Sequence, residues 1–135
     1  MDKKEPKQII VMRKDLNMRK GKMVAQGAHA SMKAILDIGH IEDSITLFAF
    51  IIPLIKRPSL VKWLLGRFTK VCVGVDSEQE LLNVYNKAKE EGLLCSLIQD
   101  AGLTEFDNIP TLTCCAVGPA YPDELDHITG HLKLL

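Results

Sequence analysis

The chain has 135 residues, of which 47% are hydrophobic and 25% are charged. This length and composition indicate one compact globular domain and exclude a disordered or fibrous protein. The 17 basic and 17 acidic side chains cancel, but residues 1–70 hold 14 Lys and Arg against 6 Asp and Glu, whereas residues 71–135 hold 3 against 11. The asymmetry fits either a positive surface that meets phosphates or two ordinary solvated faces.

Four cysteines, Cys72, Cys95, Cys114 and Cys115, occur in strand-like runs without any CxxC spacing. Metal ligation is therefore not expected, and the thiols are predicted to be buried as small apolar groups. Because the N-terminus also shows no secretory signal, we expect a cytoplasmic protein.

The first predicted elements are a buried strand at residues 8–12, a polar loop at residues 13–22 and a long helix at residues 23–38. The apolar segment at residues 45–55 is too short to span a membrane, which needs about 20 residues. We expect it to form a core or subunit-contact helix, capped by Asp43 or Ser44 and ended or kinked by Pro53.

The second half of the chain alternates between predicted helices and strands. Ser77 and Glu80 have the spacing of a capping box, and Gly92 ends the helix that they begin. Together the elements predict a three-layer α/β fold in a single domain over residues 1–135, with a four-stranded mixed sheet and helices on both faces. The other predicted elements are helices at residues 60–68 and 122–129 and strands at residues 70–75, 93–98 and 111–117.

Two loops follow strands, at residues 13–22 and 99–110, where ligands bind in such sheets. The first loop places basic side chains at the start of a helix. This pattern is typical of an anion-binding site, although it is also common in solvated turns. No GxxxxGK[ST] or GxGxxG motif is present, so nucleotide cofactor binding is not supported. The cations of this loop are Arg13, Lys14, Arg19, Lys20 and Lys22.

The helix that follows the first loop carries a polar stripe. Its side chains recur at intervals of four, three and four residues, so they align on one narrow line. Because the rest of the helix is apolar or small, we expect it to be mostly buried and to open only along this stripe, although an ordinary solvent face has the same pattern. The stripe consists of Lys22, Gln26, His29 and Lys33.

The second loop begins with Asp100 and contains Gly102 and Thr104, a pattern that is also common in turns. Alternation along the following strand predicts that Thr111, Thr113, Cys115 and Val117 share one face. A hydroxyl beside a carboxylate and a lysine can orient water and hold a developing oxyanion.

Taken together, the motifs that these residues form resemble those of a known protein family. The chain is similar to type 2 peptidyl-tRNA hydrolases over residues 7–135. The motifs that carry the resemblance are Arg13-x-Asp15-Leu16-x-Met18 with Lys20-Gly21-Lys22, Ala25-Gln26-x-x-His29-Ala30, Asp100-Ala101-Gly102-x-Thr104, Gly118-Pro119 and the terminal Gly130-His131-Leu132-Lys133-Leu134-Leu135.

The resemblance implies hydrolysis of the ester that joins a peptide to the 3′ end of tRNA, without metal or organic cofactor, by a homodimer. From the short apolar segment we expect no association with membranes. The family's implicated residues fall on Lys22, Gln26, His29, Asp100, Thr104 and Thr113. The sequence departs from the family pattern at Arg19, where glycine is frequent, and in its unusually apolar residues 40–57.

No GxSxG motif or local signature of a cysteine nucleophile occurs, so direct attack by water is favoured. We expect Asp100 to orient or deprotonate this water, with Thr104 or Thr113 in its network, and Lys22 to offset oxyanion or phosphate charge. His29 can position Gln26 or Lys22, donate a proton or satisfy a helix-to-sheet contact. Arg13, Lys14, Arg19 and Lys20, with Gln26, are predicted to bind the substrate tRNA. The alternatives are a non-catalytic RNA-binding adaptor and hydrolysis of another acyl ester or amide.

Overall fold

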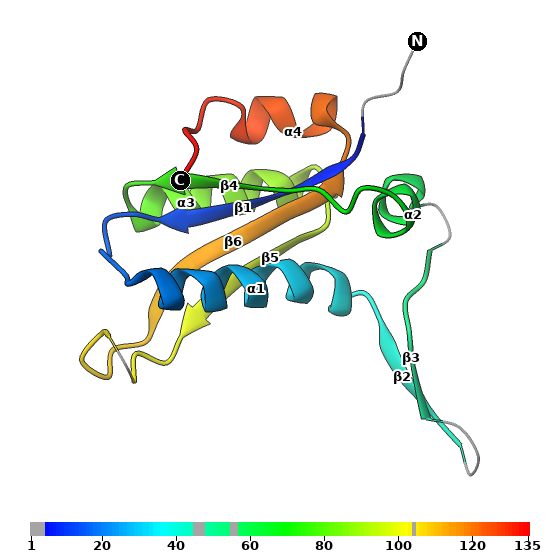
Figure 1. Ribbon diagram of the computed structural model, residues 1–135, viewed down its shortest axis with the longest axis horizontal. Helices are drawn as coiled ribbons and strands as arrows, with labels where there is room; N and C mark the ends of the chain where they lie inside the picture. The colour runs from blue at the N-terminus through cyan, green and yellow to red at the C-terminus, as the bar shows by residue number, and fades with distance from the viewer. Residues whose placement is uncertain (1–4, 45–47, 55–56, 104) are drawn as a thin grey trace.

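The computed structural model describes residues 5–44, 48–54, 57–103 and 105–135 (Figure 1). Its centre is a four-stranded sheet in the order β4-β1-β6-β5. β1 pairs with β4 in parallel and with β6 antiparallel, and β6 also pairs antiparallel with β5. The four strands are β1 (Lys7–Arg13), β4 (Lys70–Val75), β5 (Cys95–Asp100) and β6 (Thr111–Ala120).

Helices cover both faces of this sheet. The long helix α1 (Lys20–Leu36) packs on one face, where Ile10, Met12, Ala30 and Ala34 share a core. α3 (Glu78–Glu90) and α4 (Pro122–Thr129) lie on the opposite face (Figure 1). The short helix α2 (Pro58–Leu65) buries Trp63 at the end of the sheet beside α1. The predicted α/β fold with a mixed sheet between two helical layers is confirmed.

The described part of the apolar segment, residues 48–54, contains a strand and not the predicted helix. A two-stranded antiparallel hairpin of β2 (His40–Asp43) and β3 (Phe48–Ile51) extends away from the sheet instead (Figure 1). Residues 45–47 and 55–56 lie outside the described residues, and the proposed cap Asp43 belongs to β2. The run Phe48–Ile51 is short, aromatic and branched, so its periodicity alone does not separate a strand from a helix.

Several element boundaries also differ from prediction. α1 begins at Lys20 and not at residue 23, so the end of the basic loop is the first helical turn. β5 continues to Asp100, because its pairing with β6 extends to Thr111. α2 ends at Leu65, before the predicted residue 68, because the backbone of Gly66 leaves the helical region.

One edge of the sheet brings together the two loops that follow β1 and β5. β1, β4 and β5 are mutually parallel, so their carboxyl ends lie at the same edge, where α1 begins and β6 starts (Figure 1). In sheets of this kind, ligands bind outside the carboxyl ends of strands. Among the described helices, none has both the length and the apolar character to cross a bilayer.

Candidate active site

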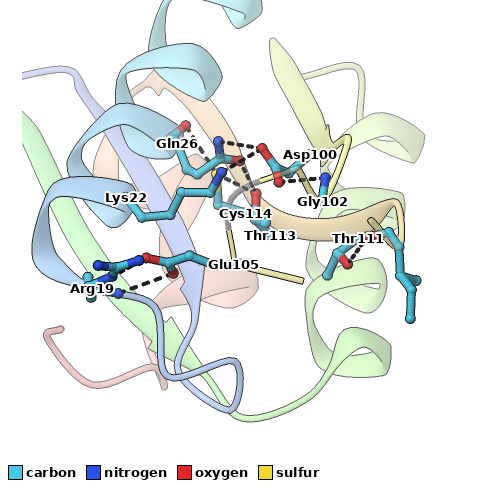
Figure 2. Close-up of polar contacts among 10 residues, drawn as sticks. Arg19, Lys22, Gln26, Asp100, Gly102, Glu105, Thr111, Thr113 and Cys114 are labelled. Atoms are coloured by element: carbon cyan, nitrogen blue, oxygen red, sulfur yellow. Dashed lines mark hydrogen bonds and ion pairs between the residues drawn. The ribbon is translucent and has the colours of Figure 1, made fainter. Parts of the chain in front are cut away.

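A carboxylate and an ammonium group meet at this edge of the sheet. Lys22, in the first turn of α1, donates to Asp100 Oδ1 at the end of β5 over 2.8 Å (Figure 2). The Gly102 N–H donates to the other oxygen, Oδ2, over 2.9 Å. Both side chains of the ion pair are 15% exposed, so the pair is largely shielded and still accessible from one side.

Gln26 connects this pair to the last strand. Its Nε2 donates to Asp100 Oδ1 over 3.4 Å, and its Oε1 accepts from Thr113 Oγ1 over 2.5 Å (Figure 2). Gln26 and Thr113 are both buried. The chain of contacts therefore runs from buried Thr113 through Gln26 to Asp100 and Lys22, and we call these four residues the Lys22–Asp100 network.

A β-bulge gives Thr113 its direction. β5 and β6 pair as Ile98 with Cys114 and Gln99 with Leu112, so Thr113 is the additional residue in β6. Thr113 and Cys114 therefore both face α1, where they contact Gln26. The predicted alternation is wrong at this point, because Cys115 and Val117 lie in the core on the α3 side.

The surroundings of Asp100 stabilise its ionised form. The hydrogen bond from Lys22 is the main cause that holds the pKa of Asp100 below its ordinary range, and burial partly opposes it. The Gly102 N–H and the charges of Lys22 and His29 lower the pKa further. A carboxylate held in this way is a good hydrogen-bond acceptor and a weak base.

The nearest thiol is protonated. Cys114 donates from Sγ to the backbone carbonyl of Gln26 over 3.2 Å, and burial raises the pKa of this thiol to about 11. Since the thiolate is the reactive form of cysteine, Cys114 is a structural donor and not a nucleophile. Of the four cysteines predicted to be buried, Cys114 and Cys115 are, whereas Cys95 is half-buried and Cys72 is exposed.

Comparisons with known proteins identify the family of the chain. Residues 6–135 match the family described as Peptidyl-tRNA hydrolase PTH2. The chain belongs to this family. It is 47% identical over 130 residues to a protein of Methanocaldococcus jannaschii named Peptidyl-tRNA hydrolase, covering 96% of this chain and 99% of the relative. Proteins with the same name from Aeropyrum pernix and Sulfurisphaera tokodaii are 43% and 42% identical, covering 95% and 96% of this chain and 94% and 98% of their own lengths.

The predicted tRNA-binding cations of this peptidyl-tRNA hydrolase family member differ in their surroundings. Arg13 is mostly buried: it donates to both carboxylate oxygens of Asp15, and over 2.9 Å to the Leu112 carbonyl. Arg13 therefore ties the end of β1 to β6. Lys14 pairs with Asp76 over 3.4 Å and is 44% exposed, and Lys20 is exposed at the start of α1.

Arg19 lies beside the network and is 82% exposed. Its Nε donates to Glu105 Oε1 over 2.7 Å, and its backbone N–H donates to Oε2 of the same carboxylate over 3.4 Å (Figure 2). Glu105 thus holds the chain at the entrance to α1. Phe106 follows Glu105 in the chain, and the Lys22 ammonium nitrogen lies over its ring, 5.8 Å from the ring centroid.

The polar stripe of α1 leads from the network to solvent. Gln26 is buried, whereas His29 and Lys33 are exposed, and Lys33 pairs with Asp37 over 3.1 Å. The expectation that α1 opens only along this stripe is wrong, because Val24 and Met32 are also exposed. Thr104, the other predicted hydroxyl, lies outside the described residues.

Two contributors escaped the sequence-based assignment of roles. Gly102 supplies an N–H to Asp100, and only glycine suits this place, because φ is +84° and a Cβ atom would collide with the backbone of Ile109. Its place in the Asp-Ala-Gly motif was the available signal. Glu105 had no recognisable pattern. Within the described ranges, no three His, Cys, Asp or Glu side chains are close enough to hold a metal ion.

Proposed function

We propose that this protein hydrolyses the ester bond between a peptide and the 3′ end of tRNA, and that the Lys22–Asp100 network is its catalytic site. The hydrogen bonds that join Lys22, Asp100 and Gln26 at the carboxyl end of β5 carry the proposal. The names of its relatives support the same activity. They give no support to a non-catalytic RNA-binding module on this fold.

Water is the proposed nucleophile. An ester is already an activated acyl group, so the site has to position water and stabilise the negative charge that develops on the carbonyl oxygen. The water oxygen bonds to the carbonyl carbon, the bond to the terminal ribose oxygen breaks, and the leaving oxygen receives the proton that water loses. The protonated Cys114 thiol is consistent with a mechanism that has no covalent intermediate.

The two charged groups then have different roles. Lys22 stabilises the oxyanion, since an ammonium group carries several donors and its charge is shielded from solvent here. Asp100 accepts a hydrogen bond from the attacking water and fixes its direction. Its lowered pKa favours this orienting role over complete removal of a proton.

Gln26 and Thr113 are proposed as positioning residues. The Gln26 amide accepts a hydrogen bond from Thr113 and donates one to Asp100, so its orientation and that of the carboxylate are coupled. His29 lies one turn farther along α1 and is exposed. We assign His29 to contact with the substrate and not to proton transfer.

The tRNA is proposed to bind over the start of α1. Lys14, Arg19 and Lys20 lie at the same edge of the sheet as the network. Such cations contact phosphates without reading sequence. Arg13 is omitted from this surface, because its guanidinium is engaged by Asp15 and the Leu112 carbonyl.

The remaining assignments rest on the sequence and on the family resemblance. We propose that the protein acts as a homodimer in the cytoplasm and that residues 1–135 form a single domain. The exposed apolar side chains of the β2–β3 hairpin, Ile41, Phe50 and Ile51, offer one surface for a subunit contact. Light scattering of the purified protein measures the oligomeric state.

The activity is tested by the release of free tRNA from N-acetylated aminoacyl-tRNA in the presence of a chelator. We expect turnover by the wild type and a loss of about 100- to 1000-fold in kcat/KM for Lys22→Ala, the usual effect of removing an oxyanion donor. Lys89→Ala, an exposed lysine on α3, is the matched control and retains full activity. No tRNA release by the wild type would refute the function, and an undiminished Lys22→Ala variant would refute the site.

A further inference from the structure

A groove runs along the side of α1 that faces β5. It has a volume of about 610 Å³. Its walls include Ala28, Met32 and Leu36 from α1, and Leu97 and Ile98 from β5. We call it the α1–β5 groove. Its surface is mainly apolar, and the one ion pair at its rim, Lys33 with Asp37, adds no net charge.

The groove begins at the catalytic network. Gln99 and His29 line its near end. Gln99 directly precedes Asp100, and His29 is close enough to that carboxylate to contribute to its lowered pKa. From there the groove follows α1 towards Leu36 and Asp37, away from Lys22. When the network holds the ester carbonyl of a substrate, the chain attached to that carbonyl can therefore extend into the groove on the β5 side.

The two parts of the substrate need different surfaces. The RNA part carries phosphates and suits the cations before and at the start of α1, Lys14, Arg19 and Lys20. The peptide part carries no phosphate and has variable side chains. An apolar surface without net charge, on the opposite side of the ester, suits this second part.

The edge of β5 adds a contact that does not depend on side chains. β5 is the outermost strand of the sheet, and β6 is its only partner among the described strands. An extended peptide can hydrogen-bond to the main chain of such an edge, whatever its sequence. This property matches a peptide whose sequence varies from one substrate to the next.

We infer that the α1–β5 groove binds the C-terminal residues of the peptide in peptidyl-tRNA. The inference rests on the proposed function and assigns a further part of its site. From Ala28 to Asp37 the helix rises about 14 Å, which accommodates about four residues of extended peptide. His29 lies at the mouth of the groove, next to the residue that is esterified to tRNA.

A second apolar cavity, of about 680 Å³, is the rival location for the peptide. It lies on the other side of α1, where Met23 and Gly27 face Phe68 and Leu135. Ile10 and Cys72, from β1 and β4, also line it, so it opens towards the opposite edge of the sheet from β5. No residue adjacent to Asp100 lines this cavity, and it therefore does not continue the path of the ester.

The test compares two substrates that share the same tRNA and the same esterified alanine: N-acetyl-Ala-tRNA and N-acetyl-Leu-Leu-Leu-Ala-tRNA. For the wild type we expect kcat/KM to be roughly tenfold higher with the longer peptide, the factor that partial burial of one or two apolar side chains provides. Leu36→Glu places a charge at the far end of the groove. This variant should lose most of the tenfold preference while its activity on N-acetyl-Ala-tRNA stays within about twofold of wild type.

Leu65→Glu is the matched control, because Leu65 is 85% exposed at the end of α2 and lies outside the groove. It should keep the full preference. Equal thermal unfolding temperatures for the variants and the wild type exclude a folding defect. An equal preference in Leu36→Glu and wild type, or no preference in the wild type, would overturn the groove assignment. Absence of activity on both substrates would instead refute the proposed function.

Discussion

The two helices that follow parallel strands in this sheet begin in opposite ways. α3, which follows β4, is capped by its own sequence: Ser77 accepts from the Glu80 N–H over 3.1 Å, and Glu78 and Glu80 lie in the first turn. In α1, which follows β1, the side chain of the N-cap residue Arg19 makes no capping hydrogen bond, and the first turn has no acidic residue. It has lysines there instead, at the positive end of the helix.

The negative charges that balance the start of α1 come from distant parts of the chain. Asp100 pairs with Lys22, and Glu105 accepts from both the backbone and the side chain of Arg19. The N-terminus of α3 is thus stabilised by neighbouring residues in the sequence, whereas the N-terminus of α1 is stabilised by tertiary contacts. This end of α1 is therefore arranged to meet anions, at some cost to helix stability.

The largest effect should come from breaking the pairing at α1. We expect Asp100→Asn to lower the free energy of unfolding at neutral pH by about 2 kcal/mol, because Lys22 then keeps a shielded charge without its carboxylate. The folded-state pKa of Asp100 is depressed, so its contribution is complete above the ordinary carboxyl pKa and is lost as the pH falls through the folded value.

Denaturant unfolding of wild type and Asp100→Asn between pH 3 and pH 7 measures this contribution. The difference between the two proteins should stay constant from pH 7 to about pH 5 and shrink only below the usual carboxyl range. A difference that already declines between pH 7 and pH 6 would show that the carboxylate is not stabilised as we describe.

A smaller effect is expected from the buried end of the same network. Thr113→Val preserves the shape of the side chain and removes the donor to Gln26. We expect kcat to fall by about tenfold with little change in KM, since the misplaced amide no longer fixes Asp100 for the reaction. Thr111→Val, which removes a hydroxyl that donates only to the nearby Ile109 carbonyl, is the control. An equal loss in both variants would argue against a specific role of Thr113.

The smallest effects come from the two N-cap positions themselves. Ser77→Ala should lower the free energy of unfolding by about 1 kcal/mol, the usual value of such a cap, and leave activity unchanged.

Arg19→Gln should leave the free energy of unfolding within about 0.5 kcal/mol of the wild-type value, raise KM and make KM less sensitive to salt. Urea unfolding and kinetics at two salt concentrations separate the cases. A salt dependence of KM identical to that of wild type would remove Arg19 from the tRNA surface.

Local sequence determined much of the fold. β1 and β4 are short branched runs bounded by polar residues, and α3 carries its own cap and its own stop at Gly92, so neighbouring residues suffice to define these elements. The motifs around Lys22, Gln26 and Asp100 also marked the residues that the structure brings together. Their grouping followed from the family resemblance, because the sequence alone gave only two loops and a stripe.

Tertiary structure decided the rest. The segment around β3 became a hairpin because a short apolar run fits either a strand or a helix until its partner is present. Thr113 faces Gln26 because a bulge, set by the pairing of β5 with β6, inserts one residue into β6. The sequence thus determined which groups are available for chemistry, whereas long-range strand pairing determined which of them meet, since register is a property of two strands and not of one.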